Sequence, residues 1–389
     1  MRFSARTNWE TTETELARAL RERKESGQPI RDITASNPTQ CGFTYDEAAI
    51  LSPLAAREAL IYDPNPQGML KAREAVCSYY RSHGATVDPV QIFLTTSTSE
   101  AYSYVFRLLC DPGDEVLIAQ PSYPLFDFLA ALDDVKLVPY ALFYDHGWHL
   151  DIEAVRSRIT PRTRAIALVH PNNPTGHFTK ANERTQLEAL CAEHNLALIV
   201  DEVFLDYPLT ETGRSFATGP HPAPTFVLSG LSKIAGLPQM KAAWISVFGP
   251  DTVLKQSLTR LEVIADTFLS MNAPIQHAVP HWLAQRHAIQ HQISRRTAAN
   301  LEALDALLAQ QTMVMRLEVE AGWYAILRIP ALRLDEETAV HLIREVGVST
   351  HPGYFFGFAG DGWLIVSLLT PGEDFMHGSQ AILRMFKEP

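Results

Sequence analysis

Four apolar runs of this 389-residue chain each end in polar residues of types that take part in catalysis. The run 225–228 stops at a Ser-Gly pair, and Lys233 follows within five residues. Burial destabilises an ammonium group, so a lysine at the end of a core strand becomes a better nucleophile toward carbonyl carbons and can form a Schiff base. Taken alone, such a lysine is more often a solvated loop residue. Its chemistry therefore depends on what the other three runs bring to it.

The other three runs, 91–95, 164–170 and 196–200, have the length and composition of buried strands. They are followed, in chain order, by Ser97-Thr98-Ser99, by Asn-Asn-Pro-Thr-Gly at 172–176, and by Asp201-Glu202. In open α/β sheets a ligand binds outside the carboxyl ends of the strands. We therefore expect hydroxyl, amide and carboxylate groups to converge on Lys233.

Three of these motifs carry a resemblance to a known family. Asn-Asn-Pro-Thr-Gly at 172–176, Asp-Glu at 201–202 and Gly-Leu-Ser-Lys at 230–233 have the order and separation found in class I and II aminotransferases, which are pyridoxal-phosphate enzymes of fold type I. The resemblance extends over nearly the whole chain. It implies that the cofactor is pyridoxal 5′-phosphate and that Lys233 holds it as a Schiff base.

The resemblance also implies an α/β fold in two parts. A large domain over residues 45–275 would contain a mixed, mostly parallel seven-stranded sheet covered by helices. A smaller α+β domain would combine residues 276–389 with the amino-terminal arm, residues 1–44. The alternation of strand and helix patterns over 45–275 independently favours a parallel sheet covered on both faces.

Lys233 and Asp201 are the predicted catalytic residues. Pyridoxal phosphate works as an electron sink for a carbanion, and this requires a protonated pyridine nitrogen. By the resemblance, the Asp201 carboxylate keeps that nitrogen protonated. The same pairing is expected to keep the pKa of Asp201 low. The alternative for an Asp-Glu pair after a strand is a helix cap.

The cofactor phosphate has several predicted partners. Ser97, Thr98 and Ser99 open a helix whose N–H groups and hydroxyls would face the anion, although a plain capping sequence looks similar. The resemblance adds Ser232 and Lys241, which stands where most of the family has arginine and supplies a point charge instead of a bidentate fork. It also adds Tyr62, which would reach the phosphate of a neighbouring subunit in a homodimer. A tyrosine packed against a proline turn is the alternative for that residue.

The cofactor ring and the substrate have further predicted contacts. Tyr123 would stack on the ring, and Asn173 would donate to its phenolate oxygen and also contact the substrate. Asn37 is equally consistent with a substrate contact and with a turn-forming Asn-Pro. The family's tyrosine for the phenolate oxygen is replaced by Phe204, which predicts a more basic imine. Whether Tyr207 replaces that hydroxyl is left open.

The largest departure from the family lies at Ile365, where the family has an arginine for the substrate α-carboxylate. Isoleucine has no donor, so either other groups, such as Arg328, hold this carboxylate or the substrate lacks it. The predicted function is transfer of an amino group between an amino acid and a 2-oxo acid. Two alternatives stay open: a lyase or decarboxylase using the same cofactor, and an aminotransferase for amines without a conventionally bound carboxylate. A non-catalytic cofactor-binding module is disfavoured by the presence of Lys233, Asp201 and Asn173.

Composition narrows the remaining classes. A net charge of −11 without a basic run argues against a nucleic-acid partner, and the chain has neither a signal-peptide core nor a membrane span. Four well-separated cysteines are typical of reduced thiols in a cytoplasmic protein. No strand is followed by the glycine motif of a nicotinamide dehydrogenase or of a P-loop protein. His277 and His281, like His287 and His291, are spaced for one helix face, but a third ligand is missing and no metal site is expected.

Overall fold

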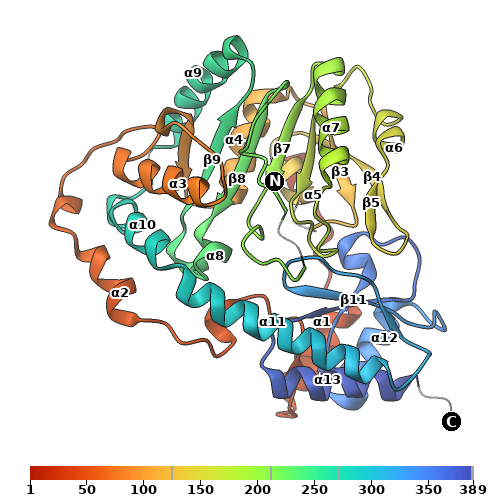
Figure 1. Ribbon diagram of the computed structural model, residues 1–389. Coiled ribbons are helices and arrows are strands. Elements are labelled where there is room, and N and C mark those ends of the chain that lie inside the picture. Colours follow the sequence, from red (N-terminus) through yellow and green to blue (C-terminus); the bar gives the residue numbers. More distant parts are fainter. Residues whose placement is uncertain (124–125, 211–212, 270, 387–389) are drawn as a thin grey trace.

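A computed structural model describes residues 1–123, 126–210, 213–269 and 271–386 (Figure 1). Its large sheet is made of β2 (Ile92–Thr95), β3 (Glu115–Gln120), β4 (Lys136–Tyr144), β5 (Trp148–Leu150), β6 (Thr163–Val169), β7 (Ala197–Asp201), β8 (Thr225–Gly230) and β9 (Ala243–Phe248). Their order across the sheet is β2-β9-β8-β7-β6-β3-β4-β5. The four apolar runs singled out in the sequence are β2, β6, β7 and β8.

The mostly parallel sheet predicted from the sequence is confirmed. Two strands run against the others: β9, which lies between β2 and β8, and β5 at the edge. The edge strand β5 adds an eighth member to the seven expected. It arises because His146 and Gly147 take positive φ angles in a tight turn, which folds residues 148–150 back onto the end of β4.

Helices bury both faces of this sheet, which explains why its strands are almost continuously apolar. The helices of this part of the chain are α2 (Glu47–Leu51), α3 (Leu70–Ser82), α4 (Thr98–Leu109), α5 (Phe126–Leu132), α6 (Ile152–Arg156), α7 (Ala181–His194), α9 (Asp251–Phe268) and α10 (Ala273–Gln285). Helices α4, α5 and α9 cover one face, and α3, α7 and α10 cover the other. Alternate residues of β7 divide accordingly, with Ile199 packed toward α4 and Val200 toward the opposite face.

A second, antiparallel sheet lies beside the first (Figure 1). Its strands are β10 (Met315–Arg316), β11 (Tyr324–Arg328), β14 (Trp363–Ser367) and β13 (His351–Pro352), in that order. Helices α11 (His287–Leu308), α12 (Asp335–His341) and α13 (Gly372–Met385) pack around it. One face of β11 and β14 joins the core of the large sheet through Ile326 and Ile365. The two sheets are therefore in direct apolar contact.

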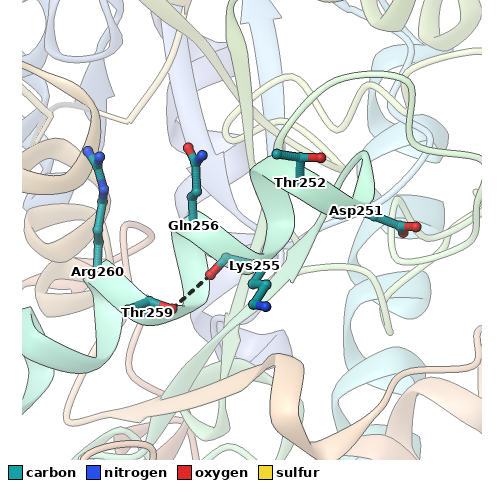
Figure 2. A pocket seen from close by; sticks show the side chains of 6 residues that line it. All are labelled: Asp251, Thr252, Lys255, Gln256, Thr259 and Arg260. Carbon is teal, nitrogen blue, oxygen red and sulfur yellow. Dashed lines mark hydrogen bonds between the residues drawn. The ribbon is translucent and has the colours of Figure 1, made fainter.

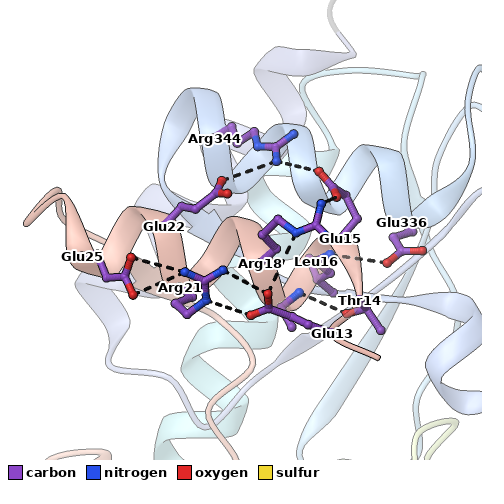
Figure 3. A network of polar contacts seen from close by, with 11 residues as sticks. Glu13, Thr14, Glu15, Leu16, Arg18, Arg21, Glu22, Glu25, Glu336 and Arg344 are labelled. Carbon is purple, nitrogen blue, oxygen red and sulfur yellow. Dashed lines mark hydrogen bonds and ion pairs between the residues drawn. The ribbon is translucent and has the colours of Figure 1, made fainter. Parts of the chain in front are cut away.

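The amino-terminal segment attaches to this second sheet. Strand β1 (Arg31–Asp32) pairs in parallel with β12 (Val348–Ser349), and helix α1 (Glu15–Glu25) packs against α12. Figure 3 shows the polar side of the helix contact, where Arg344 lies 2.6 Å from Glu15. Exposed ion pairs of this kind contribute little, so the apolar residues beneath them hold the helix. The boundaries at residues 44 and 275 stay a prediction.

Two further features of the chain bear on the sequence expectations. Among the described residues, no helix has both the length and the apolar character needed to cross a membrane. All four cysteines are free thiols.

Candidate active site

Lys233 lies in α8 (Leu231–Ile234), the single helical turn that follows β8. The Tyr207 hydroxyl donates a 2.6 Å hydrogen bond to the backbone carbonyl oxygen of Lys233. Burial lowers the pKa of the Lys233 amine to about 8, and the charge of Asp201 opposes this shift only in part. Near neutral pH about a tenth of this amine is therefore unprotonated, far more than for an ordinary lysine, and the unprotonated form is the nucleophile.

Asp201 ends β7, the strand next to β8, and pairs in register with Leu228. Its Oδ1 accepts a 3.1 Å hydrogen bond from the backbone N–H of Val203. Burial raises the pKa of Asp201 to about 6, because in the chain without the cofactor desolvation outweighs the donors and the Lys233 charge. The low pKa expected for Asp201 beside the cofactor's ring nitrogen stays a prediction. A cationic ring nitrogen is the kind of partner that would reverse this direction.

The amino terminus of α4 forms a candidate anion site. Ser97 is the N-cap, and its Oγ accepts from the N–H of Glu100 at 3.1 Å. The described structure shows no hydrogen bond from the N–H groups of residues 97–99. Lys241 lies two residues before β9, whose first residue pairs with the last residue of β2. It is exposed and follows Pro238–Met240 in a left-handed conformation. The structure thus brings the serines and Lys241 to one edge of the sheet.

Asn173 lies in a tight loop after β6. Asn172 organises this loop, because its Oδ1 accepts from the Thr175 hydroxyl at 2.8 Å while its Nδ2 donates to the Pro121 carbonyl at 3.4 Å. Asn173 is buried, and its Oδ1 has no hydrogen-bond partner in the described part of the chain. Tyr123 follows β3. Burial, and after it the charge of Asp201, raise the pKa of its hydroxyl. An uncommitted amide and an aromatic ring therefore accompany the carboxylate.

Two aromatic rings enclose the Lys233 amine. Its Nζ lies 4.9 Å from the ring centroid of Trp323 and 5.6 Å from that of Phe204. Sequence reasoning missed Trp323 as a site residue, because only the fold brings position 323 beside position 233. The Tyr207 hydroxyl donates to the Lys233 carbonyl oxygen and so fixes the lysine backbone.

Tyr102 is a second residue that the sequence did not indicate. It lies on α4, the helix that covers the same sheet face as the side chain of Asp201. Its hydroxyl is buried without a hydrogen-bond partner among the described residues. Burial first, and the Asp201 carboxylate second, raise the pKa of this hydroxyl well above its ordinary value. In the sequence, only the place of Tyr102 on the inward face of a predicted helix could have indicated that it lies near Asp201.

Ile365 and Arg328 lie on the sheet face that meets the large domain. Ile365 is fully buried and pairs with Ile326 across β14 and β11. The guanidinium of Arg328 donates to the Asp361 carbonyl oxygen at 2.8 Å and lies 4.2 Å over the ring of Trp363. The guanidinium of Arg328 is therefore bound within its own sheet. It does not supply the partner for a carboxylate that Ile365 lacks.

Two predicted residues, Tyr62 and Asn37, have no contact with Lys233 in the described part of the chain, and Ser232 is the neighbour of Lys233 in sequence. Tyr62 precedes α3 and is 78% exposed. The side chain of Asn37 caps a short helical turn, with its Oδ1 accepting from Thr39 N–H at 3.1 Å and from the Thr39 hydroxyl at 2.8 Å. This matches the turn-forming alternative and leaves the amide Nδ2 for another contact. Ser232 lies beside Lys233 in α8, and no hydrogen bond from its hydroxyl appears in the described structure.

The residues gathered here have the chemistry that pyridoxal phosphate requires. A partly buried amine and a buried carboxylate follow neighbouring strands, a helix amino terminus offers free N–H groups, and the Asn173 Oδ1 and Tyr102 hydroxyl lack hydrogen-bond partners among the described residues. A hollow of about 480 Å³ on α9 is lined by that helix alone and contains none of these residues (Figure 2). Within the described residues there is no group of three metal-ligating side chains.

Comparisons with known proteins agree with this site. The family model for aminotransferase class I and II matches residues 47–375. Glutamate-pyruvate aminotransferase AlaA of Escherichia coli is 28% identical over 260 residues, which are 66% of this chain and 64% of that protein. Aspartate/prephenate aminotransferase of Thermus thermophilus is 27% identical over 340 residues, 85% of this chain and 86% of that protein.

Solved structures show the same fold. An alanine aminotransferase from Pyrococcus furiosus superposes with a TM-score of 0.91 at 23% sequence identity, covering 100% of both chains. A single mutant of Thermus thermophilus aspartate aminotransferase gives a TM-score of 0.84 at 25% identity, covering 99% of this chain and 100% of the other. The chain spans less than two thirds of the length of glutamate-pyruvate aminotransferase AlaA and of the alanine aminotransferase of Mycobacterium bovis that it also matches.

Proposed function

This chain belongs to the class I and II aminotransferase family, and from that premise we propose that it is a pyridoxal-phosphate-dependent aminotransferase with Lys233 as its cofactor lysine. The observation that carries the proposal is the partly buried Lys233, whose amine has a lowered pKa, together with the buried Asp201 carboxylate at the edge where β7 and β8 end. Desolvation of a lysine ammonium group costs folding stability, and such a cost is typical of functional sites.

When bound, pyridoxal phosphate supplies an electron sink for the carbanion formed at the substrate α-carbon. The chain's own residues supply the rest. Lys233 Nζ acts as the nucleophile and afterwards accepts or donates a proton, since its pKa of about 8 allows both states near neutral pH. Asp201 supplies the fixed negative charge, while Trp323 and Phe204 exclude water from the Lys233 amine.

The anion-binding role is assigned to the start of α4. The N–H groups of Ser97, Thr98 and Ser99 lie at the positive end of that helix and supply dipoles for a phosphate. Lys241 adds a full positive charge from the neighbouring β9 segment. Asn173 and Tyr123 orient the ring, and Ser232 adds a hydroxyl from the turn that carries Lys233.

Borohydride reduction tests the assignment of the lysine. Reduction of the protein loaded with pyridoxal phosphate, followed by peptide mapping, should mark Lys233. The variant Lys233→Ala should take up no covalent label, while the matched control Lys255→Ala, an exposed lysine on α9, should label as the unaltered chain does. Labelling of another lysine in the unaltered chain would refute the assignment.

The proposed substrates are an amino acid and a 2-oxo acid. The names of the curated relatives suggest glutamate, alanine and aspartate as the first amino donors to try. Ile365 and the occupied guanidinium of Arg328 support a second candidate, an amine without a conventionally held α-carboxylate. A half-reaction screen of amino acids against their decarboxylated amines separates the two, and product identification separates either from a lyase.

Homodimer formation is also part of the proposal. The stretch that ends at Tyr62 exposes Leu60, Ile61 and Tyr62 together, each by more than 60%. Beside it lies a hollow of about 1030 Å³ between this segment and α10. A second copy of the chain would cover this apolar surface and place Tyr62 near the phosphate of its neighbour. We propose with it the division into domains 45–275 and 1–44 with 276–389, and a cytoplasmic location.

A further inference from the structure

One side chain of the smaller sheet region holds the loop that carries Asn173. Glu320 lies three residues before Trp323, and its Oε2 accepts a 2.9 Å hydrogen bond from the backbone N–H of Phe178. Its Oε1 pairs with the ammonium group of Lys180. Gly176 permits this approach, because a Cβ built at its φ of +70° would lie 2.4 Å from the Ala321 carbonyl oxygen. The two backbones are in contact without intervening side chains.

His177 lies at the centre of this contact. Its Nε2 is 3.1 Å from Glu183 Oε2, and its Nδ1 is 3.7 Å from Glu320 Oε2. The imidazole is 3% exposed. Glu183 is held in turn, because its Oε1 accepts from the backbone N–H of Leu150 in β5 at 2.8 Å. The ring therefore lies between one carboxylate fixed to the large sheet and one carried by the segment that leads to Trp323.

The net charge of this cluster depends on whether the His177 ring is protonated. Glu183 and Glu320 carry two negative charges, and Lys180 supplies one positive charge. The other basic groups nearby do not change this balance: burial lowers the pKa of His170 to about 3, so it is neutral, and Arg184 is paired with Glu188 at 2.7 Å. The described cluster is neutral only when the His177 ring is protonated.

The protonated state is favoured in the folded chain. Burial alone would lower the pKa of His177, but the hydrogen bond with Glu183 and the Glu320 carboxylate, 3.7 Å from Nδ1, raise it above its ordinary value. The same contacts lower the pKa of Glu320 to about 2 against the effect of burial. A group whose folded pKa is raised stabilises the fold fully below its ordinary value, and this stabilisation is lost as the pH rises through the folded value.

We propose that His177 is a positioning residue whose protonated ring fastens the Asn173 loop to Glu320, and through it to Trp323, so that the two sides of the Lys233 site stay together. Loss of the proton leaves two buried carboxylates that share one remaining cation, Lys180. The loop and the Trp323 segment then separate more easily. The consequence for the active site rests on the proposed function, whereas the contact itself does not.

The first experiment measures thermal unfolding of the cofactor-free chain between about pH 6 and pH 9. The unaltered chain should lose more Tm over this range than His177→Gln does, by about 1–2 °C. Glu193→Gln, on the same helix as Glu183, removes an exposed pair with Arg156 and should keep the pH dependence of the unaltered chain. A constant Tm difference between the unaltered chain and His177→Gln at every pH would overturn the proposal.

The second experiment measures pyridoxal-phosphate affinity by equilibrium dialysis over the same range. Titration of Lys233 and of the cofactor is common to both proteins, so the ratio of their dissociation constants isolates His177. We expect the advantage of the unaltered chain over His177→Gln to shrink severalfold as the pH rises. An advantage that is the same at every pH would indicate a purely structural role and overturn the proposal.

Two further variants keep the proposal testable. If His177→Gln does not fold, Glu320→Gln should flatten the same two profiles, because it removes one of the carboxylates that keep the ring protonated. His177→Lys, which stays charged at high pH, should restore affinity there. Failure of pyridoxal phosphate to attach to Lys233 would refute the proposed function, while the unfolding profiles would still decide the role of His177.

Discussion

At the scale of single residues, the site depends on an opposed pair of shifts. Burial lowers the pKa of Lys233 and raises that of Asp201, and neither group fully compensates the other. The chain thus keeps two incompletely neutralised groups side by side, at a cost in stability that is typical of functional sites. An incoming aldehyde and a basic ring nitrogen would satisfy both.

Cofactor capture should therefore depend on pH in a way that reports Lys233. Only the unprotonated amine attacks the aldehyde, so the rate constant for capture by the cofactor-free chain should rise through a midpoint near pH 8, well below the ordinary lysine value of 10.5. Stopped-flow absorbance across pH 6 to 10 measures it, with free lysine as the control. A midpoint at the ordinary lysine value would show that burial does not activate this amine.

The residue at position 365 should set the preference for a carboxylate. Placing a guanidinium there with Ile365→Arg should lower KM for an amino acid relative to its decarboxylated amine, by about tenfold or more if the two charges pair. Because Ile365 is fully buried, the same change should lower Tm. Tight binding of a common amino acid by the unaltered chain, through an arginine visible in a complex, would show that another residue already performs this role.

At the scale of elements, the strands that carry the site could be predicted from the sequence. The residues of other elements that lie beside these strands could not. The apolar runs 91–95, 164–170, 196–200 and 225–228 fall within about one or two residues of β2, β6, β7 and β8. Their signal is local, because strands buried on both faces are apolar throughout. Trp323 gave no such signal, because its proximity to Lys233 depends on packing between elements far apart in the chain.

The amino terminus of α4 permits a test at this scale. Ser97→Ala removes the side chain that caps Glu100 N–H, so the free energy of unfolding should fall by about 1 kcal/mol. Pyridoxal-phosphate affinity should fall as well, because the first turn that would hold the phosphate is less ordered. Urea unfolding and dialysis measure the two effects. Thr259→Ala, in the exposed middle of α9, is the control and should change neither appreciably.

At the scale of the whole molecule, the site is expected to be complete only in a pair of chains. Tyr62 is exposed here and has no contact with Lys233 within its own chain. The sequence could indicate this residue only through the family resemblance, because a contact between two chains leaves no periodic pattern in either. The exposed Leu60 and Ile61 beside it are the structural observation that supports the assembly.

Tyr62→Phe should accordingly weaken cofactor binding only in the assembled protein. The loss of one hydrogen bond corresponds to about 0.5–1.5 kcal/mol, and to more if the acceptor is charged. Dialysis combined with sedimentation measures both affinity and assembly, and Tyr354→Phe, another exposed tyrosine, is the control. A fully active monomer would contradict the assembly, and an unchanged affinity in the dimer would contradict the role of Tyr62.

The reversed strand β9 has a consequence for the size of the ligand. It separates β2 from β8, so the start of α4 and the turn that bears Lys233 are two strand spacings apart, about 10 Å. If β2 and β8 were neighbours, this separation would be half as large. The hydrogen-bonded sheet therefore sets the length of any molecule held at both ends. That molecule must extend from the helix terminus to within reach of the lysine side chain.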